Sequence, residues 1–457
     1  MKTVFLILLA LYIIAATSLA IYARKGIRNQ EDYFIGGRSI GGIVSALTYA
    51  ATTYSAFMMV GLVGFTYSTG IGSAGFELMY LVGTLFLLSY YGKKIWRESR
   101  EKGFVTPTEF FTERYGVLVT KIVAIIALIA LIPYTSAQMI GVSLILEKSI
   151  QISFQSGVLL TAFLVAIWAL LGGLKGVAWT DALQGLIMLL SAIFAVVWIY
   201  SWGFDFNTSS FMENLKNAKG VLEFPNKFWT PLTFAGFVIP WFFFSLTNPQ
   251  VFQRLFILKN SGSLRKMILL FAIFGLIYTV LTTFMGFELR ALTEVGAFPV
   301  VQRDNVTPTA IQFMPEWLAL LVSLSIIAAA VTTSNSIILT LSSMASRNIV
   351  RKASVFAGEI TIVILAVLVA LFALQRPDYI VELSVLSSTI LLCQLPLILS
   401  IFHSKKGNKV TAILTLSSGF GIAIASLFDL TLPYLPVSIW VFIVSFSVFL
   451  LFSRFES

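Results

Sequence analysis

Long apolar runs, separated by short polar stretches, follow one another along the whole chain. A helix needs ~20 mainly apolar residues to cross a bilayer, and these runs are too long and too apolar for the strands of a β-barrel. The pattern therefore predicts an all-α polytopic membrane protein with about thirteen spanning helices. The expected spans are residues 4–22, 41–68, 74–92, 119–146, 156–174, 177–202, 232–256, 267–291, 316–346, 355–374, 379–402, 410–427 and 433–452.

The composition excludes a soluble domain. Of the 457 residues, 58% are hydrophobic and 11% are charged, whereas soluble chains average about 25% charged residues. The single cysteine, Cys393, excludes an internal disulfide, and the single histidine, His403, excludes a His-based metal site. We therefore expect no transition metal, no cofactor and no enzymatic activity. Four acids near the ends of spans are expected to stay hydrated: Glu288, Glu316, Glu359 and Glu382.

The first apolar run, "MKTVFLILLALYIIAATSLA", has two interpretations. Its basic start, apolar core and small-residue end are typical of a secretory signal peptide. However, only Lys2 precedes the run, whereas Arg24, Lys25 and Arg28 follow it. This order of charges favours a retained helix whose N-terminus lies outside the cell.

Basic residues indicate the orientation of the whole chain, because cytoplasmic loops carry an excess of Lys and Arg. With an outer N-terminus, 23 of the 31 Lys and Arg residues fall on the inner side and 8 on the outer side. This predicts a multi-pass protein of the cell membrane with a cytoplasmic C-terminus. The formal charge of +10 needs no nucleic-acid partner, because the basic residues are spread over many segments. The outer segment 203–231 predicts a short surface helix around "SSFMENLKNA".

Two of the expected spans carry helix-breaking sequences. The second contains "TYAATTYSAF" (48–57), and the seventh contains Pro240 and the pair Asn248-Pro249. Broken helices at membrane depth are tolerated only where protein or a wet cavity satisfies the freed backbone. Small residues can also simply allow close helix packing. Two breaks that lie five spans apart instead favour a transporter built from inverted repeats, with its site near the midplane.

The repeats define the expected organisation of a single transport domain. An extra helix at 4–22 precedes the first repeat at 41–202, and the second repeat at 232–402 precedes two further helices at 410–452. Main-chain carbonyls freed near the first break suit a small monovalent cation. The ninth span offers hydroxyls on one helical face at Ser325, Thr332, Ser336 and Thr340, flanked by Thr333 and Asn335.

Four segments resemble motifs of the sodium:solute symporter family. They are "EDYFIGGRSIGG", "GGLKGVAWTDALQG", "NPQVFQRLFILKNSGSLRK" and "AAAVTTSNSIILTLSSMASRNIVRK", and they follow in the family's order over most of the chain. The resemblance is to proline- and pantothenate-type members of the amino acid–polyamine–cation superfamily. It implies a LeuT-like fold with a 5+5 inverted repeat, formed here by spans 2–6 and 7–11.

The resemblance also implies ion sites. The family's shared Na⁺ site maps onto Ala51, Tyr54, Ala329, Thr332 and Thr333. A second Na⁺ site, present in some members, maps onto Asp181, Asn335 and Ser336. Asp181 can alternatively pair with Lys175 or face a hydrated inner vestibule. Proline-type members carry an aspartate where this chain has Thr53, which weakens a strict transfer of proline specificity.

The implied solute pocket lies beside the ion. Its expected residues are Thr53, Ser55, Met58, Glu77, Tyr134, Thr135, Trp241 and Ser245. Trp241 can alternatively face lipid within "PWFFF", and Glu77 can instead complement the positive N-terminus of its helix. Together these features predict Na⁺-coupled uptake of a small solute, such as a proline-like amino acid or a pantothenate-like organic acid, by a monomer or weak oligomer. A proton-coupled symporter and a transporter-like sensor are the alternatives.

Overall fold

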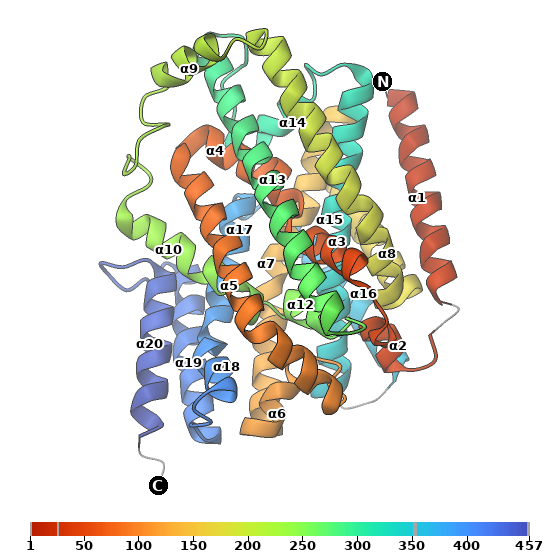
Figure 1. Cartoon of the computed structure of the whole chain (residues 1–457), viewed down its shortest axis with the longest axis vertical. Coiled ribbons are helices and arrows are strands. Elements are labelled where there is room, and N and C mark those ends of the chain that lie inside the picture. The colour runs from red at the N-terminus through yellow and green to blue at the C-terminus, as the bar shows by residue number, and fades with distance from the viewer. Residues whose placement is uncertain (1, 25–26, 351–353, 455–457) are drawn as a thin grey trace.

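Helices that run roughly along the long axis of the molecule make up the architecture (Figure 1). The computed structural model describes residues 2–24, 27–350 and 354–454. Within these ranges the backbone forms helices and no strand, apart from one isolated bridge between Ile40 and Leu258. The first helix begins at one end of the molecule and the last helix ends at the opposite end (Figure 1). This arrangement fits an odd number of spans.

Each of the thirteen predicted spans lies on helix. In the described part of the chain, nine helices are long and apolar enough to cross a membrane, or ten when a bent pair is counted as one span. The longest of them, α8 (Phe154–Phe204), has 51 residues and covers two predicted spans, because Gly173 leaves the helical conformation at φ 52°. The remaining two spans are the second broken helix and the 16-residue α20 (Val437–Phe452).

The other spanning segments follow the predicted order. They are α1 (Lys2–Arg24), the bent pair α3 (Gly42–Thr53) and α4 (Val63–Thr69), α5 (Ile71–Glu101), α7 (Val117–Ile150), α13 (Ser261–Glu294), α15 (Glu316–Met344), α16 (Val355–Leu374), α17 (Ile380–Leu391) with α18 (Leu395–Phe402), and α19 (Lys409–Ala425). Short helices connect them at the two ends: α2 (Gln30–Ile35), α6 (Glu109–Tyr115), α9 (Thr208–Asn217) and α14 (Val306–Ala310). The surface helix predicted in 203–231 is confirmed as α9.

The first helix packs on the body of the protein. Tyr12 packs edge-on against Trp168 of α8, and the Trp168 indole N–H donates to the Thr17 hydroxyl at 2.9 Å. The opposite face of α1 exposes aliphatic side chains such as Leu11 and Ile14. One face of α1 therefore packs on α8, and the opposite face is exposed.

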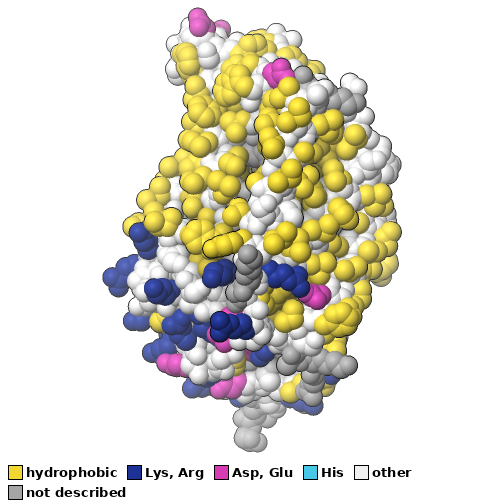
Figure 2. Space-filling model, turned by 90° about the vertical axis from the view of Figure 1, so that its right-hand side faces the viewer, with side chains coloured by type: hydrophobic (Ala, Val, Ile, Leu, Met, Phe, Trp, Pro, Cys, Tyr) yellow, Lys and Arg dark blue, Asp and Glu magenta, His cyan; other side chains and the backbone are white. Residues whose placement is uncertain are grey.

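Surface chemistry differs between the two ends. Hydrophobic side chains cover much of the face in Figure 2, while Lys and Arg side chains gather around its lower part. That distribution agrees with a lipid-facing body and a basic inner end. The prediction that Glu288 stays hydrated is wrong: α13 continues to Glu294 and packs against α8 and α9, so Glu288 is fully buried.

Candidate functional site

The first helix break falls within the predicted stretch. Helix α3 ends at Thr53, Tyr54 leaves the helical region at φ −89° and ψ 82°, and a π-helical turn, η2 (Phe57–Leu62), leads into α4. The two arms of the span are bent by 50°. Ser55 helps to cause the break, because its side-chain oxygen accepts the Phe57 N–H at 3.1 Å and so competes with the helical pattern.

Helix α7 satisfies the backbone groups that the break releases. The Gln138 side-chain oxygen accepts the Ala56 N–H at 3.2 Å, and the Tyr134 hydroxyl donates to the Thr53 carbonyl at 3.3 Å. The two side chains lie one turn apart on α7 and are fully buried. Sequence reasoning missed Gln138, although a lone glutamine within the apolar run "YTSAQMIGV" was an available signal.

Four of the five predicted Na⁺ ligands meet at this break. The Ala51 carbonyl accepts the Thr333 hydroxyl at 2.9 Å and the Thr332 hydroxyl at 3.2 Å, and Thr332 also lies 3.0 Å from the Ala329 carbonyl. The fifth residue, Tyr54, stands at the end of α3, so its carbonyl lies outside the regular helix. All five residues are buried. The cluster presents neutral oxygens and no ionised side chain, which suits a small monovalent cation.

The residues of the predicted second Na⁺ site are arranged differently. Asp181 Oδ2 accepts the Thr48 hydroxyl at 2.5 Å and pairs with the Arg254 guanidinium at 3.4 Å. Ser336 also accepts a hydrogen bond from Arg254, whereas Asn335 lines a small cavity beside α1 and α8. The alternative pairing of Asp181 with Lys175 is wrong, because the basic partner comes from the second broken span.

The second break follows the prolines. Helix α10 (Pro231–Phe242) gives way to α11 (Phe244–Thr247), and Asn248 adopts an extended conformation before α12 (Pro249–Phe252) and the turn η3 (Gln253–Leu255). Pro249 disfavours the helical conformation at the preceding residue. The freed Thr247 carbonyl accepts the Gln394 side-chain N–H at 2.5 Å. A buried glutamine therefore satisfies a backbone group at this break as well.

Trp241 and Glu77, two residues of the predicted solute pocket, contact each other. The Trp241 indole N–H donates to Glu77 Oε2 at 3.1 Å, and the two residues are 3% and 1% exposed. The lipid-facing alternative for Trp241 is therefore wrong. The helix-terminus alternative for Glu77 is also wrong, because α5 begins at Ile71 and Glu77 lies beyond its first turn.

Aromatic rings surround this pair. The rings of Phe57, Phe76, Tyr80 and Phe244 all have centroids 5.1–5.8 Å from that of Trp241. Sequence reasoning did not select these four, although Tyr80 follows Glu77 by one helical turn. Buried oxygens of Thr53, Ser245 and Tyr80 have no hydrogen-bond partner among the described residues. Such groups are available to the polar atoms of a bound solute.

The remaining pocket predictions divide into two groups. Tyr134 and Ser55 flank the break, as described above, and Met58 is buried on the turn η2. The Thr135 hydroxyl instead donates to the Leu131 carbonyl of its own helix at 2.7 Å. No contact in the described structure brings the Thr135 hydroxyl to the other pocket residues, so its solute role stays a prediction.

The α4 end of the first broken span is covered by the segment around α14. The Thr307 hydroxyl donates to the Met59 carbonyl on η2, and Asp304 Oδ2 accepts the Ile380 N–H at 2.9 Å. Burial raises the pKa of Asp304 to about 6, while the Ile380 hydrogen bond and the Arg303 charge oppose that rise. Arg303 also pairs with Glu382. Of these contacts, the Thr307 hydrogen bond joins the predicted second repeat to the first, and the other two lie within the second repeat.

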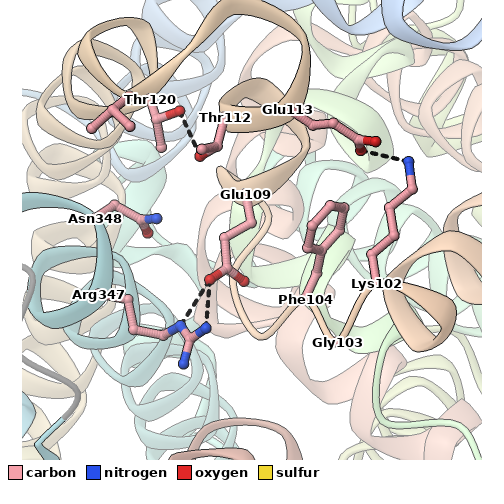
Figure 3. Close-up of a pocket in the computed structure, with 10 residues that line it drawn as sticks. Lys102, Gly103, Phe104, Glu109, Thr112, Glu113, Thr120, Arg347 and Asn348 are labelled. Carbon is pink, nitrogen blue, oxygen red and sulfur yellow. Dashed lines mark hydrogen bonds and ion pairs between the residues drawn. The ribbon is translucent and has the colours of Figure 1, made fainter.

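A cavity of about 470 Å³ opens near α6. Figure 3 shows two ion pairs at this cavity, one between Arg347 and Glu109 at 2.7 Å and one between Lys102 and Glu113 at 2.5 Å. Asn348 accepts hydrogen bonds from the hydroxyls of Thr106 and Thr108, at 2.9 and 2.8 Å. The contacts of Arg347 and Asn348 fasten the π-helical turn η5 (Ala345–Ile349), which follows α15, to α6 and the α5–α6 connection.

Known proteins resemble this chain over most of its length. The model of the sodium:solute symporter family matches residues 33–419. The chain is 27% identical to the sodium/pantothenate symporter of Haemophilus influenzae over 369 residues, covering 77% of this chain and 75% of that relative. It is 29% identical to the Escherichia coli sodium/pantothenate symporter over 193 residues, which span 41% of this chain and only 40% of that relative. For the sodium/proline symporter of Staphylococcus aureus the identity is 26%, covering 57% of this chain and 51% of that relative.

Solved structures show the same fold. The substrate-bound outward-open Na⁺-coupled sialic acid symporter superposes with a TM-score of 0.86, at 17% identity, covering 99% of this chain and 98% of that one. MhsT in complex with L-phenylalanine gives a TM-score of 0.58, at 13% identity, covering 91% of this chain and 98% of that one. The chain therefore has the LeuT-like fold of these transporters.

Proposed function

This chain belongs to the sodium:solute symporter family of Na⁺-coupled membrane transporters, and on that premise we propose where it holds Na⁺. The ion binds the carbonyls of Ala51, Tyr54 and Ala329 and the hydroxyls of Thr332 and Thr333. The observation that carries this assignment is the convergence of both hydroxyls on the Ala51 carbonyl, at 2.9 and 3.2 Å. When Na⁺ enters, rotation of the hydroxyl hydrogens turns oxygen lone pairs toward the ion.

Coupling follows from the position of the ion at a helix break. Na⁺ joins α3 to α15, and the residues just beyond Ala51 reach the solute pocket through Thr53 and Ser55. Binding of the ion therefore fixes the conformation of the pocket wall. The effect is reciprocal, so the solute tightens Na⁺ binding by the same factor as Na⁺ tightens solute binding. Inward movement of each charge contributes ~2.3 kcal/mol per 100 mV of membrane potential.

Sodium suits this site better than a proton. A proton-coupled cycle needs a titratable group at the ion site, and the five proposed ligand atoms are carbonyl and hydroxyl oxygens. All proposed ligands come from one chain, so a monomer is sufficient. We place the N-terminus outside and the C-terminus in the cytoplasm. Lys and Arg side chains gather around the end of the molecule at which the chain ends (Figures 1 and 2), and cytoplasmic segments carry an excess of these residues.

The solute we propose carries an ammonium group, as an amino acid does. Glu77 is a buried carboxylate, and none of the ion pairs in the described part of the chain involves it. A buried charge is costly unless it is paired. Aromatic faces also attract cations, and rings surround Glu77 and Trp241. A proline-like amino acid, whose ammonium group can pair with Glu77, therefore fits this pocket better than a pantothenate-like anion, which has no such group.

Uptake by the purified protein in proteoliposomes tests this function. A panel of labelled proline, other small amino acids, pantothenate and a neutral sugar is offered with an inward Na⁺ gradient, an inward K⁺ gradient or an inward proton gradient. We expect uptake above equilibrium only with Na⁺, and only for solutes that carry an ammonium group. Accumulation driven by protons alone contradicts the proposed ion, and preferred uptake of pantothenate contradicts the proposed solute class.

A further inference from the structure

A buried arginine lies directly beside the proposed Na⁺ site. Arg254 belongs to η3, which follows the second helix break, and its side chain is 1% exposed. Its guanidinium contacts the Asp181 carboxylate at 3.4 Å and the Thr52 hydroxyl at 3.1 and 3.2 Å, and it donates to the Ser336 hydroxyl. Asp181 in turn accepts the Thr48 hydroxyl.

These contacts place a fixed positive charge among oxygens that suit a cation. One carboxylate and two hydroxyls from three different helices converge on the same guanidinium. The carboxylate charge is already neutralised, and a second cation at the same oxygens would be repelled strongly in a low-dielectric interior. Asn335, the remaining residue of the predicted second ion site, lines a small cavity with Gln184 and Trp168.

We propose that Arg254 takes the place of a second Na⁺, so that this transporter binds one Na⁺ in each cycle. The proposal rests on the proposed Na⁺ site at Ala51 and extends it to the coupling stoichiometry. An arginine serves this purpose because its guanidinium stays charged and donates several hydrogen bonds in fixed directions.

The same side chain also acts as a positioning residue for the first ion. Thr52 directly follows Ala51, and Ser336 lies three residues beyond Thr333 on α15. Arg254 contacts the hydroxyls of Thr52 and Ser336, and its own backbone belongs to the second broken span. It therefore joins the two broken spans and α15 immediately beside the Na⁺ ligands, without contacting the ion.

Direct counting of bound Na⁺ on the purified full-length protein tests the proposal. ²²Na⁺ binding is measured for the wild type, Arg254→Gln, Arg254→Lys, and Arg254→Gln combined with Asp181→Asn. We expect one ion for the wild type and for Arg254→Lys, which keeps a cation. We expect two ions for Arg254→Gln, because the Asp181 carboxylate becomes free, and one again for the double variant.

Each outcome decides between the alternatives. Two ions on the wild type overturn the proposal, and this measurement does not depend on whether any variant folds. A folded Arg254→Gln protein that binds only one ion also overturns it, with folding checked by thermal unfolding. No bound Na⁺ on the folded wild type instead contradicts the proposed Na⁺ site at Ala51. Adding Thr332→Ala and Thr333→Ala to Arg254→Gln removes one of its two ions if the two sites are separate.

Discussion

Ala51 is the residue at which the helix break and the proposed ion site coincide. Its carbonyl has lost the helical environment and accepts two hydroxyl groups from α15 instead. Two residues further along, Thr53 accepts a hydrogen bond from Tyr134 through its carbonyl and keeps an unpartnered hydroxyl. Ion contacts and solute contacts are therefore separated by a single turn of chain, which makes direct coupling between them physically reasonable.

Neutralising Glu77 tests the proposed ammonium site. Loss of one partner of a buried charge pair typically costs ~2–5 kcal/mol, so we expect Glu77→Gln to raise the KM for an amino acid by ~30-fold or more. The matched control is Glu101→Gln, which makes the same chemical change on an exposed side chain at the C-terminal end of α5. If Glu77→Gln transports the amino acid with an unchanged KM, Glu77 does not hold an ammonium group.

Sequence reasoning reached some of these residues and not others for identifiable reasons. Hydroxyls repeated on one face of an apolar helix are conspicuous, so Thr332 and its neighbours were predicted. Arg254 was not predicted, because an arginine at the end of an apolar run is usually a hydrated inner-loop residue. Its burial depends on Asp181, which lies in a distant part of the sequence. The aromatic rings around Trp241 were also missed, since phenylalanines in a membrane span ordinarily face lipid.

At the scale of elements, both broken spans depend on buried glutamines. Gln138 accepts the Ala56 N–H at the first break, and Gln394 donates to the Thr247 carbonyl at the second. Water is absent from the bilayer core, so each freed backbone group needs a protein partner. The prolines and small residues predicted where the breaks lie, but the partners come from helices remote in sequence and could not be read from local patterns.

Replacing Gln138 tests whether its hydrogen bond to the Ala56 N–H stabilises the protein and the ion site. Gln138→Met keeps the side-chain volume but leaves the Ala56 N–H buried and unpaired, which typically costs ~1–3 kcal/mol. We expect a lower midpoint of thermal unfolding together with weaker Na⁺ binding, because the break carries the Ala51 carbonyl. The control is Gln184→Met, whose glutamine bonds Tyr12 of α1 and no helix break. Equal Na⁺ affinity in both variants would show that Gln138 has no part in shaping the ion site.

At the scale of the whole molecule, the pattern of apolar runs predicted the spans well. Hydrophobicity alone decides which segments cross a bilayer, and the matched family and the superposed structures agree with the predicted fold. The limits of the two repeats, 41–202 and 232–402, stay predictions, because no observation tests where each repeat begins and ends. The ion pairs near α6, such as Arg347 with Glu109, depend on tertiary packing and were not foreseen.

The central claim is that Na⁺ binds at the Ala51 break and drives uptake. The most direct measurement is Na⁺-dependent solute uptake into proteoliposomes by Thr332→Ala combined with Thr333→Ala. Its control is Thr282→Ala with Thr283→Ala, an adjacent pair on α13 whose hydroxyls bond carbonyls of their own helix. The account predicts that the first variant loses Na⁺ dependence, with Na⁺ affinity weakened more than ~tenfold, or ~1.4 kcal/mol, while the control keeps it. Uptake that remains driven by Na⁺ in the Thr332 and Thr333 variant, at the wild-type Na⁺ affinity, would contradict the account.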